Sequence, residues 1–276
     1  MKRLFLSVCC CLGMSISYAA VSDIADNEKC VEAMQNGHYD VAVQQCEYES
    51  EKGNAEAAEI LGYIYLKGKS GSRDWGQAKK YLEMALDGGR ITAGKYLAVL
   101  YWNGLGVQRS HEKAMELFND CIRYERDNGG VDCKVQLAKT LSFGTNTKDE
   151  HRYAKDIYAE LVSNGYYEYS LELAKIHKTL GNNDLAYRYA EFFIWWAKRY
   201  GTVEHLNLIN TEANMVKNSV LGALSNNQVN EAYTWVKNEI FRINEEHLKA
   251  QQTAGADNSS KQTEKSEAHA GDAANP

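Results

Sequence analysis

Four leucines that are each followed by glycine or alanine are spaced along the chain at intervals of 36, 40 and 36 residues. The four pairs are Leu61-Gly62, Leu97-Ala98, Leu137-Ala138 and Leu173-Ala174. A period of this length is typical of stacked two-helix units, in which each unit buries an apolar face that it cannot bury alone. This repeat constrains the fold more than any other feature of the sequence.

Residues around each pair mark the ends of the helices. A glycine lies seven residues after each of the first three leucines, where the chain turns through a positive φ at the end of a helix. These glycines are Gly68, Gly104 and Gly144. Asp74 and Ser110 then offer side-chain oxygens that cap the next helix. Small residues in matching places let the second helix approach the first: Ala78, Ala114 and Ala154.

The runs Ala57 to Gly89 and Ala93 to Gly106 resemble the Sel-one-like repeat, a relative of the tetratricopeptide repeat. Its pattern reads A-x-x-x-L-G-x-x-Y-x-x-G-x-G-V-x-x-D-x-x-K-A, and here Ala98 replaces the usual Gly and Ser110 the usual Asp. The resemblance implies an all-α fold, a right-handed α-solenoid of antiparallel helix pairs over residues 20–201. It also suggests an exported bacterial member of the family.

Residues 202–249 keep a helical pattern but leave the repeat. One apolar stripe predicts a helix: Leu206, Ile209, Ala213, Val216, Val220 and Leu224. After a turn at residues 225–227, a second stripe predicts another: Val229, Ala232, Val236, Ile240 and Ile243. Since a solenoid leaves an apolar face open at its end, this pair is expected to cap the stack. Residues 250–276 offer almost no apolar side chains beyond alanine, so we expect a disordered tail.

The first nineteen residues have the pattern of a signal peptide cleaved near Ala19. Lys2 and Arg3 precede an apolar stretch too short to span a bilayer, and Ser17 and Ala19 are small, as signal peptidase requires. A lipoprotein signal at Cys9 is the alternative, although Val8 stands where a small residue is needed. The sequence therefore predicts a periplasmic or secreted protein without a membrane-spanning helix.

Four cysteines remain after the signal, which suggests two disulfides in an exported chain. Cys30 and Cys46 lie symmetrically about a turn near residue 38, and Cys121 and Cys133 about a turn near residue 127. Symmetry of this kind places two sulfurs at similar heights on antiparallel helices. Cys30–Cys46 and Cys121–Cys133 are thus the predicted bridges, with four buried free thiols as the alternative.

The net charge and the absence of catalytic motifs argue against several classes of function. The formal charge of −6 becomes −8 without Lys2 and Arg3, which argues against a general nucleic-acid binder. The sequence contains no H-E-x-x-H zinc motif and no G-x-S-x-G nucleophile motif, so we expect no catalytic residues, metal or cofactor.

His177, in the place of the repeat tyrosine, is interpreted as a core or rim substitution. An aromatic group between Tyr166 and Tyr200 is expected to pack against the cap, with partner binding as the alternative.

The resemblance implies that the first helix of each pair lines the concave side. Positions two and six residues after each leucine should then face a binding groove for a protein or peptide. They are Tyr63 and Lys67, Val99 and Asn103, and Lys139 and Phe143, with only the first position, Lys175, taken from the last unit. The resemblance also implies an envelope adaptor, or an immunity protein that blocks a secreted toxic enzyme. A cell-wall-directed or β-lactam-binding enzyme and a structural part of an envelope motor or pilus are the alternatives.

Overall fold

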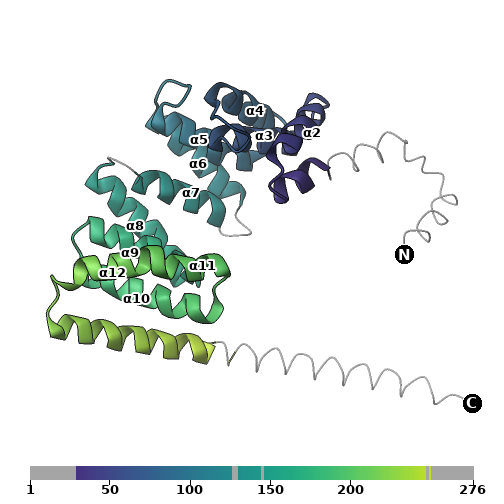
Figure 1. Cartoon of the computed structure of the whole chain (residues 1–276). Coiled ribbons are helices and arrows are strands. Elements are labelled where there is room, and N and C mark those ends of the chain that lie inside the picture. The colour runs from purple at the N-terminus through teal and green to yellow at the C-terminus, as the bar shows by residue number, and fades with distance from the viewer. Residues whose placement is uncertain (1–28, 126–129, 144–145, 247–248, 250–276) are drawn as a thin grey trace, which may run out of the picture. The chain divides into compact units, whose positions relative to one another are not determined.

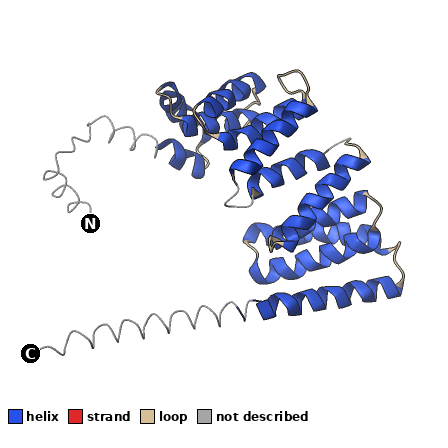
Figure 2. Ribbon diagram, turned by 180° about the vertical axis from the view of Figure 1, so that it is seen from behind, coloured by secondary structure: helices blue, strands red, loops and turns tan. Residues whose placement is uncertain are grey.

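The computed structural model describes residues 29–125, 130–143, 146–246 and 249 (Figure 1). Within these residues the chain forms helices joined by turns, and none of them belongs to a β-strand (Figure 2). The predicted signal peptide lies outside the described residues, and so does the predicted tail. The chain divides into two compact units, Met1–Thr145 and Asn146–Pro276, which are described one at a time.

Unit 1 consists of consecutive antiparallel helices, preceded by a helical turn over residues 29–35. Its helices are α2 (Tyr39–Glu51), α3 (Ala55–Lys67), α4 (Trp75–Asp87), α5 (Gly94–Asn103), α6 (His111–Tyr124) and α7 (Val131–Ser142). A short 3₁₀ turn, η2 (Ile91–Ala93), leads into α5. Helix α3 packs against α4, and α5 against α6, so the predicted pairs are the pairs that form.

The predicted helix ends are confirmed in the first two pairs. Gly68 and Gly104 adopt the left-handed conformation, with φ of 67° and 68°, and end α3 and α5. Asp74 caps α4 by accepting from the backbone N–H of Gln77, and Ser110 caps α6 in the same way. Local sequence therefore sets the length of each helix and the register between neighbours.

Helix α7 ends differently. Its last residue is Ser142, and Phe143 follows in an extended conformation. Gly144, the predicted terminator, lies outside the described residues. As a result, Phe143 leaves the helix instead of continuing its face.

The repeat positions form the core of unit 1. Leu61, Leu97 and Leu137 are at most 3% exposed. A Cβ added to Gly62 would lie 2.5 Å from Cγ of Leu82, so glycine permits the close approach of α3 and α4. Both predicted disulfides are present: Cys30–Cys46 with a Cα–Cα distance of 5.1 Å, and Cys121–Cys133 with one of 5.9 Å.

Unit 2 begins with α8 (Lys148–Ser163), whose N-cap Thr147 forms a capping box with Glu150. The 3₁₀ turn η4 (Tyr167–Tyr169) and helices α9 (Ser170–Thr179) and α10 (Asn183–Tyr200) follow. After α10 come α11 (Val203–Leu208), the π-helical segment η5 (Ile209–Ala213), α12 (Asn214–Leu221) and a helix over residues 226–246. Helix α9 packs against α10, which continues the paired arrangement.

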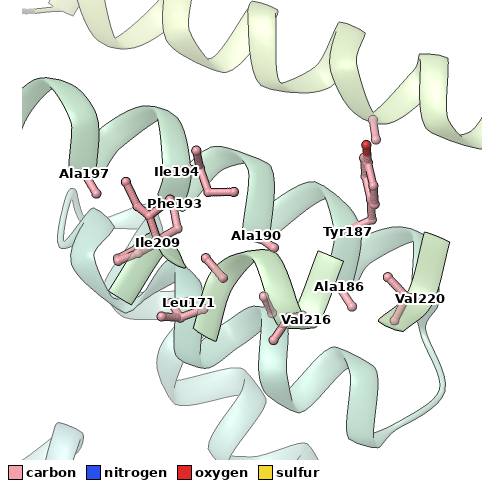
Figure 3. Packing of buried hydrophobic residues seen from close by; sticks show 13 residues of the cluster. Leu171, Ala186, Tyr187, Ala190, Phe193, Ile194, Ala197, Ile209, Val216 and Val220 are labelled. Atoms are coloured by element: carbon pink, nitrogen blue, oxygen red, sulfur yellow. The ribbon is translucent and has the colours of Figure 1, made fainter. Parts of the chain in front are cut away.

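The core of unit 2 is centred on α10. Phe193 and Ala190 are fully buried between α9 and the segment from η5 to α12 (Figure 3). Tyr187 points toward the helix over residues 226–246, where its hydroxyl donates to that of Tyr233 at 3.0 Å. Phe192 is also fully buried and lies 5.8 Å from Trp235 between ring centroids. The main part of the aromatic group thus packs against the C-terminal helices, as we expected.

The first capping helix is not continuous. The stripe from residue 206 to 224 predicts one helix, whereas the structure has α11, a π-helical turn and α12. The wider turn moves Leu206 out of the stripe, and its side chain is 41% exposed. Ser225 exchanges hydrogen bonds with Gln228 and the last helix begins at residue 226, so the turn ends two residues earlier than predicted. The all-α fold of antiparallel helix pairs is confirmed.

Candidate partner-binding face

Six of the seven predicted groove residues belong to unit 1. They lie on the first helices of successive pairs, and α5 contacts both α3 and α7. We call these six the first-helix face: Tyr63 and Lys67 on α3, Val99 and Asn103 on α5, Lys139 on α7, and Phe143 just after α7. Because the three helices adjoin in sequence order, the face runs across the repeats.

Most of the first-helix face is open to solvent. Lys67, Asn103 and Lys139 are exposed, and Phe143 is 81% exposed. Tyr63 and Val99 are half-buried between their neighbours. Phe143 is the most exposed of the large apolar side chains that the structure describes, so its ring is available to a partner.

Positive charge gathers at the C-terminal ends of α3 and α7. Burial lowers the pKa of the Lys67 ammonium, and the charges of Lys139 and Arg73 lower it further. Lys67 and Lys139 come from helices two repeats apart, so the stacking brings like charges together. We call Lys67, Arg73, Lys139 and Phe143 the basic end of the face. This end is positive although the chain as a whole is acidic.

The other end of the face is aromatic and acidic. The rings of Tyr63 and Tyr96 meet edge to face, with centroids 5.3 Å apart. Beside them lies a hollow of about 180 Å³. Its lining comes from the 29–35 turn, from α3, from the loop before η2 and from α5: Met34, Glu56, Glu59, Ile60, Tyr63, Arg90 and Tyr96. We call this the tyrosine hollow.

An ion pair between a buried carboxylate and a partly exposed arginine forms part of the tyrosine hollow. Glu59 is 8% exposed, and its Oε2 accepts from Arg90 Nε at 2.8 Å, with Arg90 Nη2 at 2.7 Å. The hydroxyl of Thr92 donates to the same oxygen at 3.1 Å. Arg90 Nη2 also lies 3.8 Å from Oε1 of Glu56. Arg90 is therefore fixed against α3 by a two-point contact.

Tyr96 lies in a negative field. Burial raises the pKa of its hydroxyl, and the charge of Glu59, with smaller effects from Asp132 and Glu125, raises it further. Lys95 Nζ lies 5.3 Å from the centre of the Tyr96 ring and 3.7 Å from Asp132 Oδ2. The described charges that raise the pKa of this hydroxyl are therefore carboxylates from α3, α7 and the end of α6.

The sequence analysis did not identify Glu56, Glu59, Arg90 or Tyr96 as site residues. A signal for the two glutamates was present, because residues 56, 59, 63 and 67 follow the helical spacing of one face of α3. Arg90 carries no such signal. It reaches Glu59 from 31 positions along the chain, and only the packing of the next pair brings it there.

Lys175, the seventh predicted residue, belongs to unit 2. Its ammonium pairs with Glu172 at 2.8 Å and with Glu212 of η5. Burial disfavours its charge, but the hydrogen bonds to Glu172 and Glu212 outweigh that effect and raise its pKa. The capping segment thus engages Lys175 within its own unit.

His177 is a core residue, as interpreted from the sequence. It is 7% exposed and stacks on Tyr189 with ring centroids 5.5 Å apart. Burial lowers its pKa to about 4, with a smaller contribution from the charge of Lys155. The imidazole is consequently neutral at physiological pH.

One trio of described residues has the spacing of a metal site: Cys121, Glu125 and Cys133. The two cysteines are joined in a disulfide, and disulfide sulfurs do not supply the thiolates that bind metal. No described helix is long and apolar enough to cross a membrane.

Neither a protein-family model nor a curated protein matches the sequence. The similar solved structures include two repeat proteins. One is a protective antigen present in uropathogenic Escherichia coli strains with an SLR fold, at 17% identity and a TM-score of 0.42, over 72% of this chain and 48% of that one. The chain thus spans about half the length of that antigen. The other is a Sel1 repeat protein from Oxalobacter formigenes, at 15% identity and a TM-score of 0.46, over 74% of this chain and 91% of that one.

The assignment of the fold depends on the chain itself. Its recurring leucine and small-residue pairs are buried between paired helices, and its glycines end the first helices in the left-handed conformation. The chain thus forms the stacked antiparallel helix pairs that its resemblance to the Sel-one-like repeat implies.

Proposed function

We propose that the chain is an exported protein–protein interaction module that binds a segment of its partner along the first-helix face of unit 1. The proposal assigns it no catalytic role. The observation that carries it is the approach of Lys67 on α3 to Lys139 on α7, together with the exposed Phe143 that directly follows α7. Surface charges of like sign cost free energy when they stand together, and an acidic group on a partner relieves that cost.

Export is supported by two observations of different kinds. The two disulfides suit an oxidising compartment such as the periplasm or the extracellular space. The predicted signal peptide gives a route to that compartment. We therefore place the proposed interaction in the periplasm or outside the cell.

Within this class we propose an envelope adaptor, or an immunity protein that blocks a secreted toxic enzyme. Both roles use the same chemistry, which is recognition of one protein by a stack of helices. The identity of the partner separates them: an assembly of envelope proteins indicates the adaptor, and a single toxic enzyme indicates the immunity protein.

Site-specific photo-crosslinking in the native envelope tests the face. A benzophenone amino acid replaces Phe143 in one variant and Tyr124 of α6 in a matched variant. Tyr124 is also in unit 1 and is 63% exposed, but it lies on the second helix of its pair. We expect a covalent adduct of defined mass from position 143 and at most a trace from position 124. An adduct from position 124 alone would overturn the proposed face.

A further inference from the structure

The tyrosine hollow differs in chemistry from the rest of the first-helix face. We propose that it receives a cationic side chain of the partner, an arginine or a lysine. This inference rests on the proposed function, since it names a group that the bound segment would carry. Three observations carry it: the walls of the hollow, the balance of charge around it, and its place relative to the basic end.

The walls suit a long side chain with an apolar stem. Met34, Ile60 and the two tyrosine rings are half-buried, so each presents part of its apolar surface to the hollow. Arginine and lysine bury their methylene groups along such surfaces and keep their charge at the polar end. The face of a tyrosine ring also attracts a cation.

The charge around the hollow is negative. Glu56 and Glu59 line it beside one cation, Arg90. Asp132 and Glu125 act on Tyr96 from α7 and from the end of α6, and one further cation, Lys95, pairs with Asp132. Among the described residues that line the hollow, two carboxylates thus stand beside one cation. A guest with a positive charge would bring this group closer to neutrality.

Arg90 does not make the hollow an anion site. Its Nε and Nη2 both contact Glu59, a carboxylate that is 11% exposed in its side chain. An incoming anion could reach the exposed part of this guanidinium only beside Glu59 and Glu56, whose negative charges oppose it. An incoming cation leaves the pair intact and lies near Glu56 at the rim, whose side chain is 42% exposed.

The hollow and the basic end define a direction along the face. Glu56 and Lys67 are eleven residues apart on α3, which at about 1.5 Å per residue is roughly 16 Å. A partner segment that uses both ends would carry a basic residue at one end and an acidic residue about 16 Å away. Reversing that order would place like charges together at both ends.

Titration with two isosteric probes tests the hollow without the natural partner. N-acetyl-arginine methylamide carries a guanidinium, and N-acetyl-citrulline methylamide has nearly the same shape without the charge. Each is added to the oxidised, isotope-labelled protein at low salt, and NMR shifts are followed at Tyr63, Tyr96 and Glu56. We expect the arginine probe to shift these signals with about fivefold higher affinity than the citrulline probe.

Two matched variants locate the effect. Glu56→Gln should remove most of the preference for the arginine probe, whereas Glu112→Gln, on the exposed surface of α6, should leave it unchanged. Equal affinity for both probes would overturn the proposal in favour of an uncharged guest, and so would shifts confined to residues outside the hollow. The titrations are done without the natural partner. Either failure would therefore overturn the cationic guest without deciding the crosslinking test of the first-helix face.

Discussion

The rings of Tyr63 and Tyr96 lie edge to face with centroids 5.3 Å apart, although the two residues belong to successive helix pairs. Tyr63 therefore has two tasks under our proposal. It joins α3 to α5, and it lines both the first-helix face and the tyrosine hollow. Tests of binding at this position must be separated from its effect on stability.

Truncation of Tyr63 should destabilise unit 1. We expect Tyr63→Ala to lower the free energy of unfolding by about 1–2 kcal/mol, since it removes the ring contact with Tyr96 and leaves a gap. Tyr63→Phe keeps the ring and should change the free energy of unfolding little. Urea denaturation of both variants measures the difference, and an equal loss in the two would mean that the hydroxyl is the important group.

Oxidation should yield only the two bridges within helix pairs. Peptide mapping without reduction is expected to give Cys30–Cys46 and Cys121–Cys133 peptides. Replacing both cysteines of one pair by alanine should cost about 3 kcal/mol, because the bridge restricts the unfolded chain. A peptide that joins Cys46 to Cys121 would contradict the structure.

Close approach of α3 and α4 depends on Gly62. In Gly62→Ala the new Cβ would meet Leu82 Cγ at 2.5 Å, so Leu82 must move within a packed core. We expect a net loss of about 1–2 kcal/mol despite the better helix propensity of alanine. Gly76→Ala on α4 is the control, since its Cβ meets no closer atom than Asp74 Oδ1 at 3.4 Å. A control variant less stable than Gly62→Ala would contradict this account of the packing.

Acid should weaken unit 2 through His177. Burial holds its pKa near 4 in the folded protein, below the ordinary value of 6.5. The unfolded chain thus binds a proton between pH 6.5 and pH 4 that the folded chain does not, so stability falls as the pH drops through this window. Solvent screening reduces the effect of this shift, so the loss attributable to His177 is on the order of 1–2 kcal/mol.

The variant His177→Phe isolates this effect. Phenylalanine keeps an aromatic ring against Tyr189 and has no proton to gain. Unfolding of the variant and of the native protein is compared at pH 7 and at pH 4. We expect a smaller decrease in the variant, and parallel curves would show that other groups cause the acid sensitivity.

Much of the fold could be predicted because its determinants are local. Gly68 and Asp74 set the end of one helix and the start of the next through their own backbone and side-chain preferences. The two cysteines of each bridge are likewise placed symmetrically about one turn between neighbouring helices, so their pairing is also determined locally. The π-helical turn of η5 could not be predicted, since an apolar stripe specifies which face is buried but not a local widening of the helix.

The candidate site was only half predictable. Lys67 and Lys139 follow from the repeat spacing, and the structure brings their charges together. The pairing of Arg90 with Glu59 depends on how the next helix pair packs, and nothing in the spacing of the two residues indicates it. Lys175 fits the repeat spacing too, but the capping segment supplies Glu212 as its partner.

The most direct test of the central claim measures affinity for the crosslinked partner, once identified, with two double variants. Tyr63→Ala with Phe143→Ala removes the two aromatic rings of the first-helix face. Lys79→Glu with Lys113→Glu reverses two charges on the second helices α4 and α6. Circular dichroism first establishes that both variants are folded at the temperature of the assay. We predict that the first pair weakens binding at least roughly tenfold, about 1.4 kcal/mol, and that the second pair changes it little. Loss of binding in the second pair with full binding in the first would contradict the claim that the first-helix face holds the partner.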